Sequence, residues 1–146
     1  MAEAGTTKTA TLFTPGSANR ALPYVRAVVD DLVESYGRLR KADALRKRAQ
    51  TAHPSTGSSP AEREIVARHA EEEAQSARAD LQRTLRELEA VGVEVKDPEI
   101  GLLDFPGEMA GKRICLCWKR GEESVAWWHD PEAGFAGRRP LSAEGV

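Results

Sequence analysis

Residues 114–141, ICLCWKRGEESVAWWHDPEAGFAGRRPL, contain all three tryptophans of the chain and decide the architecture of its C-terminal part. Two runs of apolar and aromatic residues, Arg113 to Lys119 and Ser124 to His129, flank the polar segment 120–123. Short runs of this kind, bounded by Gly or charged residues, are typical of β-strands. The stretch therefore predicts a β-hairpin whose turn is Arg120-Gly121-Glu122-Glu123.

The length of that turn predicts which residues of the two strands face each other. If Lys119 lies opposite Ser124, then 118 pairs with 125, 116 with 127 and 114 with 129. Side chains alternate between the two faces of a strand, so this register places Trp118, Trp127 and His129 on one face. The other face then carries Cys115, Cys117, Ala126 and Trp128. Both faces are apolar, which predicts a hairpin buried on both sides.

The residues before this hairpin have the period of helices. Thr14 followed by Pro15 is typical of a helix start, and Pro23 predicts a kink after a short helix over 15–21. From Pro23 onward, apolar residues recur three and four apart and form one stripe to about residue 50. They are Leu22, Val25, Val29, Leu32, Tyr36 and Leu39.

A second helix is expected over 60–92, after the Pro-, Gly- and Ser-rich loop 51–60. Its seam is rich in alanine in the first half and in leucine in the second, and Gly92 supplies a stop. The prediction is an α+β fold, in which a long antiparallel helical hairpin (13–50 and 60–92), kinked near Pro23, packs on a small antiparallel sheet within a β-rich unit, 93–146. Two helices leave apolar surface uncovered, which predicts a homodimer.

Bulk properties exclude several classes of protein. The chain has 146 residues, with 21 Lys and Arg against 23 Asp and Glu, so its charge of -2 favours neither nucleic acid nor an anionic membrane as partner. Residues 1–12 read as a flexible leader and 13–146 as one domain. No segment approaches the ~20 apolar residues of a membrane span, and the start does not resemble a secretion signal. We expect a cytoplasmic protein.

Charge is distributed unequally between the two predicted helices. The first helix is locally basic, from Arg38 to Arg48, and the second is acidic at its start, from Glu62 to Glu73. We expect these charges to pair across the hairpin and to set its antiparallel alignment. His69 with Glu72 and Glu73 has a spacing that suits a metal on one helix face, although a solvated acidic face explains the same pattern.

Two polar residues of the C-terminal unit, each costly in free energy to place among apolar neighbours, form the main candidate site. Asp104 lies among apolar residues on a predicted strand, where a carboxylate needs something to neutralise it. His129 lies at a strand end among aromatic residues, where it could act as a general base or a metal ligand. The structural alternatives stay open: Asp104 as a turn cap or ion-pair partner of Arg113 or Arg138, and His129 bonded to backbone at the edge of the core.

Other residues complete this candidate site. Trp118 and Trp128 are expected as its walls, and Arg138 in the glycine-bracketed loop 134–140 as an anchor for an anion. The same arginine could instead pair with the protein's own acids. Cys115 and Cys117 could bind a soft metal, but buried thiols are more often inert packing. The chain's two cysteines cannot form a four-cysteine zinc site.

Several ordered motifs resemble a bacterial family known as domain of unknown function 2203. The most specific are Asp104-Phe105-Pro106, Leu116-Cys117-Trp118, Trp128-His129 and residues 134–138. The likeness extends over nearly the whole chain after the leader. The family label implies a coherent domain but no activity, so it strengthens the location of a site more than its chemistry.

These observations predict a metal or small-molecule pocket in the C-terminal unit, with Asp104 and His129 as its catalytic or metal-ligating centre and a divalent metal ion as the suggested cofactor. The residues do not decide whether the protein is an enzyme. The alternative is a module without catalytic activity, in which the hairpin self-associates or grips a partner helix.

Overall fold

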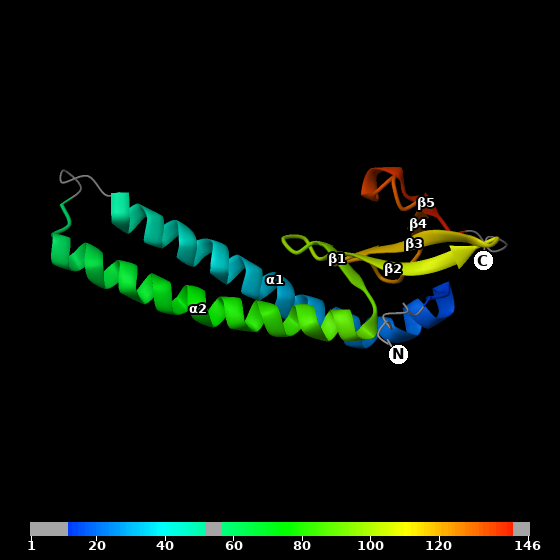
Figure 1. The fold of residues 1–146 in the computed structure, drawn as a ribbon, viewed down its shortest axis with the longest axis horizontal. Coiled ribbons are helices and arrows are strands. Elements are labelled where there is room, and N and C mark those ends of the chain that lie inside the picture. Colours follow the sequence, from blue (N-terminus) through cyan, green and yellow to red (C-terminus); the bar gives the residue numbers. More distant parts are fainter. Residues whose placement is uncertain (1–11, 52–56, 142–146) are drawn as a thin grey trace, which may run out of the picture.

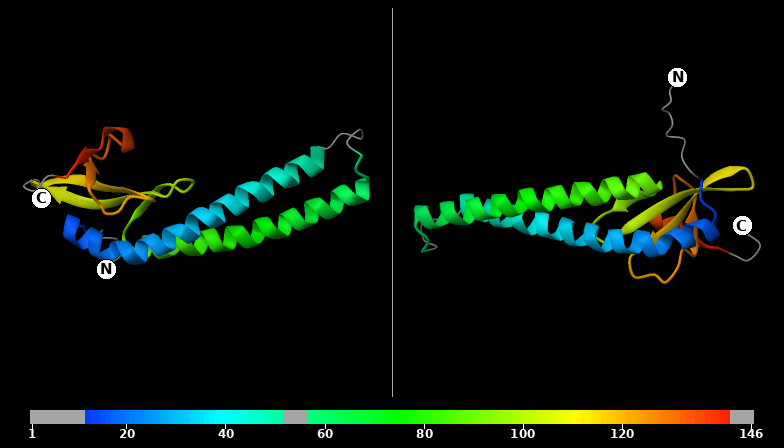
Figure 2. Two further views of the ribbon diagram at one scale, coloured as in Figure 1. Left: turned by 180° about the vertical axis from the view of Figure 1, so that it is seen from behind. Right: turned by 90° about the horizontal axis from the view of Figure 1, so that it is seen from below.

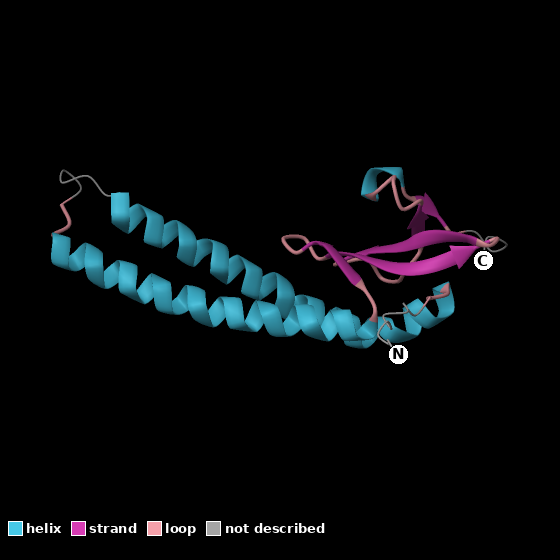
Figure 3. Cartoon of the chain, viewed as in Figure 1, coloured by secondary structure: helices cyan, strands magenta, loops and turns pink. Residues whose placement is uncertain are grey.

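A computed structural model describes residues 12–51 and 57–141. Two helices, α1 (Pro15–Thr51) and α2 (Pro60–Val91), form an antiparallel hairpin and are followed by five strands in the order β1-β2-β3-β4-β5 (Figure 1; Figure 3). The predicted α+β fold is confirmed. The leader, apart from Leu12, and loop residues 52–56 lie outside the described residues.

Helix α1 begins where its sequence predicts. The Thr14 hydroxyl accepts a hydrogen bond from the Ser17 amide, at 3.0 Å, and Pro15 occupies the first turn. The prediction of a separate short helix over 15–21 is wrong, because α1 continues through Pro23 to Thr51. The ribbon does bend within its blue N-terminal part (Figure 1), as helices containing an internal proline do.

Helix α2 has strong signals at both ends. Ser59 caps its N-terminus and exchanges side-chain and backbone hydrogen bonds with Glu62 in a capping box. At the other end Gly92 has φ 103°, in the left-handed region, and its amide donates to Leu88 and Glu89. These caps explain why the predicted bounds of α2 agree with the structure. Neither long helix in the described part of the chain carries an apolar stretch able to cross a membrane.

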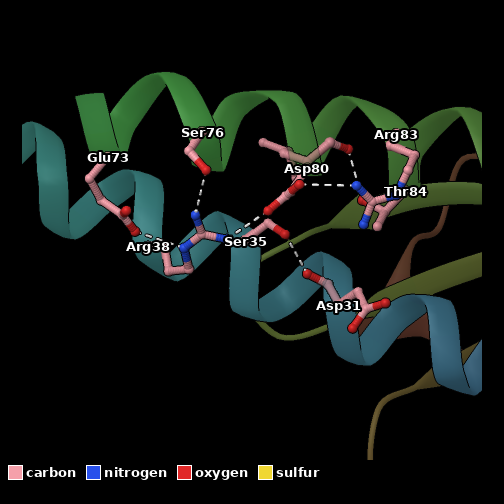
Figure 4. A network of polar contacts seen from close by, with 9 residues as sticks. Asp31, Ser35, Arg38, Glu73, Ser76, Asp80, Arg83 and Thr84 are labelled. Carbon is pink, nitrogen blue, oxygen red and sulfur yellow. Dashed lines mark hydrogen bonds and ion pairs between the residues drawn. The ribbon is translucent and has the colours of Figure 1, made fainter. Parts of the chain in front are cut away.

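Ion pairs join the two helices, as their charges predict. Figure 4 shows Arg38 of α1 between Glu73 and Asp80 of α2, with 2.8 Å from guanidinium nitrogen to carboxylate oxygen in both pairs. Nearer the tip, Arg46 pairs with Glu71 at 2.9 Å. These groups are partly exposed, so the pairs contribute more to alignment than to stability.

The sheet is antiparallel throughout. Its strands are β1 (Glu94–Asp97), β2 (Leu102–Met109), β3 (Lys112–Lys119), β4 (Trp127–His129) and β5 (Arg139–Pro140), and a short 3₁₀ helix, η3 (Phe135–Gly137), precedes β5. Strand β2 runs through Pro106 and Gly107 to Met109. There the Phe13 amide donates to the Pro106 carbonyl, and a Cβ at Gly107 would lie 2.8 Å from the Phe13 oxygen.

The register of β3 and β4 differs from the prediction by one residue. Leu116 lies opposite Trp128 rather than Trp127, and Cys115 lies opposite His129. Residues 120–126 form a longer connection because Asn19 of α1 binds both the amide and the carbonyl of Val125, at 2.8 and 3.2 Å. The predicted strand from Ser124 therefore begins only at Trp127. A shift of one residue exchanges the two faces, so His129 and Trp127 share a face with the cysteines.

The sheet has one apolar and one mixed face. The apolar face packs on the N-terminal part of α1 and the end of α2, and Phe13 contacts Phe105 edge to face, with 5.1 Å between ring centroids. The loop that contains η3 lies on the opposite side of the sheet, whereas the hairpin extends beyond the sheet (Figure 1; Figure 2). The core of the fold therefore lies on one side of β2, β3 and β4, and a separate cluster lies on the other.

Candidate functional site

Three potential metal ligands meet on the mixed face of the sheet. Asp104 of β2, Cys117 of β3 and His129 of β4 each place one ligand atom within 4.8 Å of those of the other two. All three side chains are buried, with 1%, 0% and 2% of their surface exposed. In residues 12–51 and 57–141 this is the one group of three metal-capable side chains with this spacing.

The strand register builds this cluster. Asp104 lies directly opposite Cys117 in the β2–β3 pair, and His129 lies opposite Cys115, two residues from Cys117 along β3. Residues two apart on a strand point to the same face, and neighbouring strands place their paired residues side by side. The cluster therefore depends on the register, since a one-residue shift of β4 would turn His129 into the apolar face.

Hydrogen bonds fix the orientation of the His129 ring. Its Nδ1 lies 2.7 Å from the backbone carbonyl of Asp130, which can only accept, so Nδ1 carries a hydrogen. Nε2 then points to Oδ1 of Asp104 at 3.0 Å. In a neutral imidazole with this tautomer, Nε2 has a lone pair facing a carboxylate oxygen. Either a proton or a cation must lie between these two atoms for the contact to be favourable.

The second oxygen of Asp104 is also unusual. Among the described residues, no donor makes a hydrogen bond of acceptable geometry to Oδ2, although this atom is buried. A buried carboxylate oxygen without a partner loses its hydration with no compensation, and such atoms often mark functional sites. Asp104 therefore has unused capacity to bind a cation.

Cys117 is held as a thiol by its surroundings. Burial raises the pKa of the Cys117 thiol, and the charge of Asp104 adds to this effect, while a contact from Arg138 opposes it. The Nη1 atom of Arg138 lies 3.8 Å from Sγ. A metal ion reverses this balance, because a coordinated thiol loses its proton.

Arg138 lies beside the cluster, but its guanidinium is already engaged. Both of its terminal nitrogens donate to the carboxylate of Glu122, and the group stacks over the rings of Trp127 and Phe135, at 4.5 and 4.3 Å from their centroids. Burial works to raise the pKa of Glu122, but hydrogen bonds from Arg138 and the Lys119 amide hold it below its usual value. The structure thus shows the predicted alternative, an arginine paired with the protein's own acid, in place of a free anion anchor.

The expected tryptophan walls lie elsewhere. Trp118 and Trp128 point to the apolar face, opposite to His129. For Trp118 the reason is the one-residue shift of the register, whereas Trp128 lies next to His129 on β4 and points to the opposite face in either register. Trp118 is fully buried in the core and its indole nitrogen donates to the Glu122 carbonyl at 3.0 Å. Trp127 takes the place beside the site. His69, with its neighbouring acids, is exposed on α2 and belongs to no such cluster.

Asp104 and His129 are brought together as predicted, whereas Cys117 was expected to be inert packing. The alternation of β3 carried a signal for Cys117, because it places both cysteines on one face. Only the register could add His129 to that face. Glu122 was expected as part of a turn, and its pairing with Arg138 had no signal in the sequence.

A comparison with protein-family models finds a match to the uncharacterized conserved proteins of DUF2203 over residues 11–141. The chain belongs to this family. Searches of curated proteins and of solved structures found no match. In this DUF2203 protein, the three clustered residues come from three of the motifs that carry the resemblance, at 104–106, 116–118 and 128–129.

Proposed function

We propose that this protein binds a divalent metal ion of the zinc class through Asp104, Cys117 and His129. Carboxylate, thiolate and imidazole together form a ligand set that zinc accepts. Tetrahedral zinc with ordinary bond lengths separates its ligand atoms by roughly 3.3–3.8 Å. The three ligand atoms lie within 4.8 Å of one another, so small side-chain adjustments suffice for binding.

The contact between His129 and Asp104 carries the proposal. The Asp130 carbonyl holds the hydrogen of His129 on Nδ1, so Nε2 offers its lone pair toward the cluster. Orientation of a metal-binding histidine by a backbone carbonyl on its other nitrogen is a common feature of metal sites. A cation would satisfy Nε2 and the unpartnered Oδ2 of Asp104 together.

The number of protein ligands bears on the type of site. Structural zinc sites have four protein ligands, whereas catalytic sites have three and leave a position for water or substrate. The cluster supplies three. A zinc ion held by these three side chains would keep a fourth coordination position that the cluster itself does not fill.

Metal analysis of protein produced without an affinity tag tests the proposal. We expect about one zinc ion per chain, by the three-ligand stoichiometry, and loss of most of this zinc in Cys117→Ser. Cobalt substitution should give a thiolate-to-cobalt charge-transfer band that Cys117→Ser removes. Cys115→Ser is the matched control, since Cys115 lies on the same strand and face but outside the cluster.

Two results would overturn the proposal. One is a failure of the chelated and dialysed protein to take up zinc, cobalt, iron, nickel, copper or manganese. Circular dichroism must show that this protein is folded. The other is Cys117→Ser and His129→Gln variants that keep the parent zinc content. A metal-free protein would leave Asp104 and His129 as a hydrogen-bonded pair that shares one proton.

A further inference from the structure

The hairpin extends beyond the sheet (Figure 1). In its distal part, residues of both helices line a groove. It has a volume of about 670 Å³, and the small residues that line it are Gly37, Ala42 and Ala70. Alanine and glycine leave little apolar surface to hold two helices together, because each buries few carbon atoms. The groove is therefore a hollow that the hairpin does not fill with its own side chains.

The larger apolar residues of this region are exposed. Leu45 of α1 and Val66 of α2 line the groove and are 38% and 44% exposed. In a helical hairpin that is stable by itself, large apolar residues of this kind point inward. Here Ala42 and Ala70 are buried, whereas Leu45 and Val66 are exposed at the rim, which is the pattern of a surface that another helix covers.

The charges at the groove favour one helix over the other as the one that covers it. The groove side of α1 carries Arg38 and Lys41 with one acid, Glu34, so its net charge is positive. The groove side of α2 carries Glu73, which also pairs with Arg38 of its own chain. The surrounding surfaces follow the same division, with basic residues on the distal part of α1 and acidic ones on the first part of α2. Contact between two copies of α1 would bring like charges together, whereas α1 against α2 brings opposite charges together.

We propose that a second copy of this chain covers the groove, with α1 of each copy lying over α2 of the other in a four-helix arrangement. The two-fold axis runs along the hairpin, so that both tips point the same way. Leu45 then meets Val66 of the partner subunit, and Lys41 meets the partner's Glu73. Both contacts occur twice, as a two-fold interface requires. This inference is independent of the metal site.

Measurement of mass in solution tests this interface. Sedimentation equilibrium should show a mass of two chains for the parent, and Val66→Glu should weaken the dimer at least about tenfold, because it places charge in the covered groove. Ile65→Glu is the matched control: Ile65 is 45% exposed, next to Val66, and does not line the groove. A monomeric parent, or equal effects of the two variants, would overturn the proposal.

A charge exchange tests the orientation. Lys41→Glu and Glu73→Lys should each be monomeric alone, since each places like charges at both contacts. An equimolar mixture of the two should form a heterodimer, in which opposite charges meet at both contacts again. Circular dichroism must show that each variant is folded, because Glu73→Lys also removes the partner of Arg38. Folded variants that fail to pair on mixing would overturn the proposed orientation.

Discussion

The two faces of strands β2, β3 and β4 share a backbone but differ in chemistry. One face carries Leu103, Phe105, Leu116 and Trp118, all fully buried against the helices. The other carries Asp104, Cys117 and His129, which are just as inaccessible to water. Burial therefore does not distinguish core from site in this protein. What distinguishes them is whether the buried atoms need a partner, because carbon atoms do not and carboxylate or imidazole atoms do.

This difference means that the faces should respond differently to substitution. A change on the apolar face removes packing, whose contribution does not depend on any ligand. A change on the site face removes a proposed ligand atom, whose contribution to metal binding appears only when metal is present. The predictions below separate these two kinds of contribution, from the largest effect to the smallest.

Phe105→Ala should have the largest effect on stability. The ring is fully buried and contacts Phe13, so its removal leaves a cavity and should cost about 3–5 kcal/mol. Urea unfolding should show the same loss with excess zinc and with a chelator. A loss present only with zinc would contradict the assignment of this face as core.

Asp104→Asn should remove the stabilisation that zinc provides. At free zinc about one hundred times the dissociation constant, binding stabilises the parent by about 2.7 kcal/mol. The variant should gain little, because an amide is a poor metal ligand. Urea unfolding with and without zinc measures both gains, and a full gain in the variant would exclude Asp104 as a ligand.

Zinc affinity should rise with pH. Burial keeps the pKa of the Cys117 thiol above its usual value, so the thiol is protonated near neutral pH and must lose its proton on binding. Each proton released gives about a tenfold rise in affinity per pH unit, or about 1.4 kcal/mol. Competition with a zinc indicator between about pH 6 and 8 measures the slope. Cys117→Ser should release one proton fewer on binding, which lowers the slope of log affinity against pH by one. An unchanged slope would contradict the role of this thiol.

The smallest effect should come from Cys115, on the site face but outside the cluster. Burial, with the charges of Asp104 and Glu94, raises its pKa from 9.0 to about 11. The folded state thus favours the protonated thiol, and this preference stabilises the folded chain. The stabilisation is present below pH 9 and is lost as pH rises toward about 11. In zinc-free protein, Cys115→Ser should reduce the alkaline loss of stability. Identical pH profiles for variant and parent would show that Cys115 does not contribute.

Much of the fold follows from local signals. The pair Ser59 and Glu62 with Pro60, and Gly92 at the other end, define α2, because caps act through hydrogen bonds within a few residues. The apolar neighbours of Asp104 are enough to show that burying its carboxylate costs free energy. Pro23 was misjudged in part, since tertiary packing keeps α1 continuous across a residue that weakens an isolated helix.

The sequence indicates where the site lies but not which residues come together in it. Asp104 and His129 stand out by residue type, whereas Cys117 resembles an ordinary buried thiol until its neighbours are known. Glu122 resembles a turn residue until its carboxylate is found against Arg138. In both cases the decisive partner lies on another element.

The sequence by itself determined the two helices, their capped ends and charge pairing, and the presence of a strand-rich unit with costly polar residues. The helices and their caps depend on residues close together in the chain, and the charge pairing follows from the opposite net charges of the two helices. Only the tertiary structure decided which face of the sheet holds His129, because Asn19, more than one hundred residues away, binds Val125 and delays the start of β4. That contact shifts the register by one residue and so brings His129, Cys117 and Asp104 together.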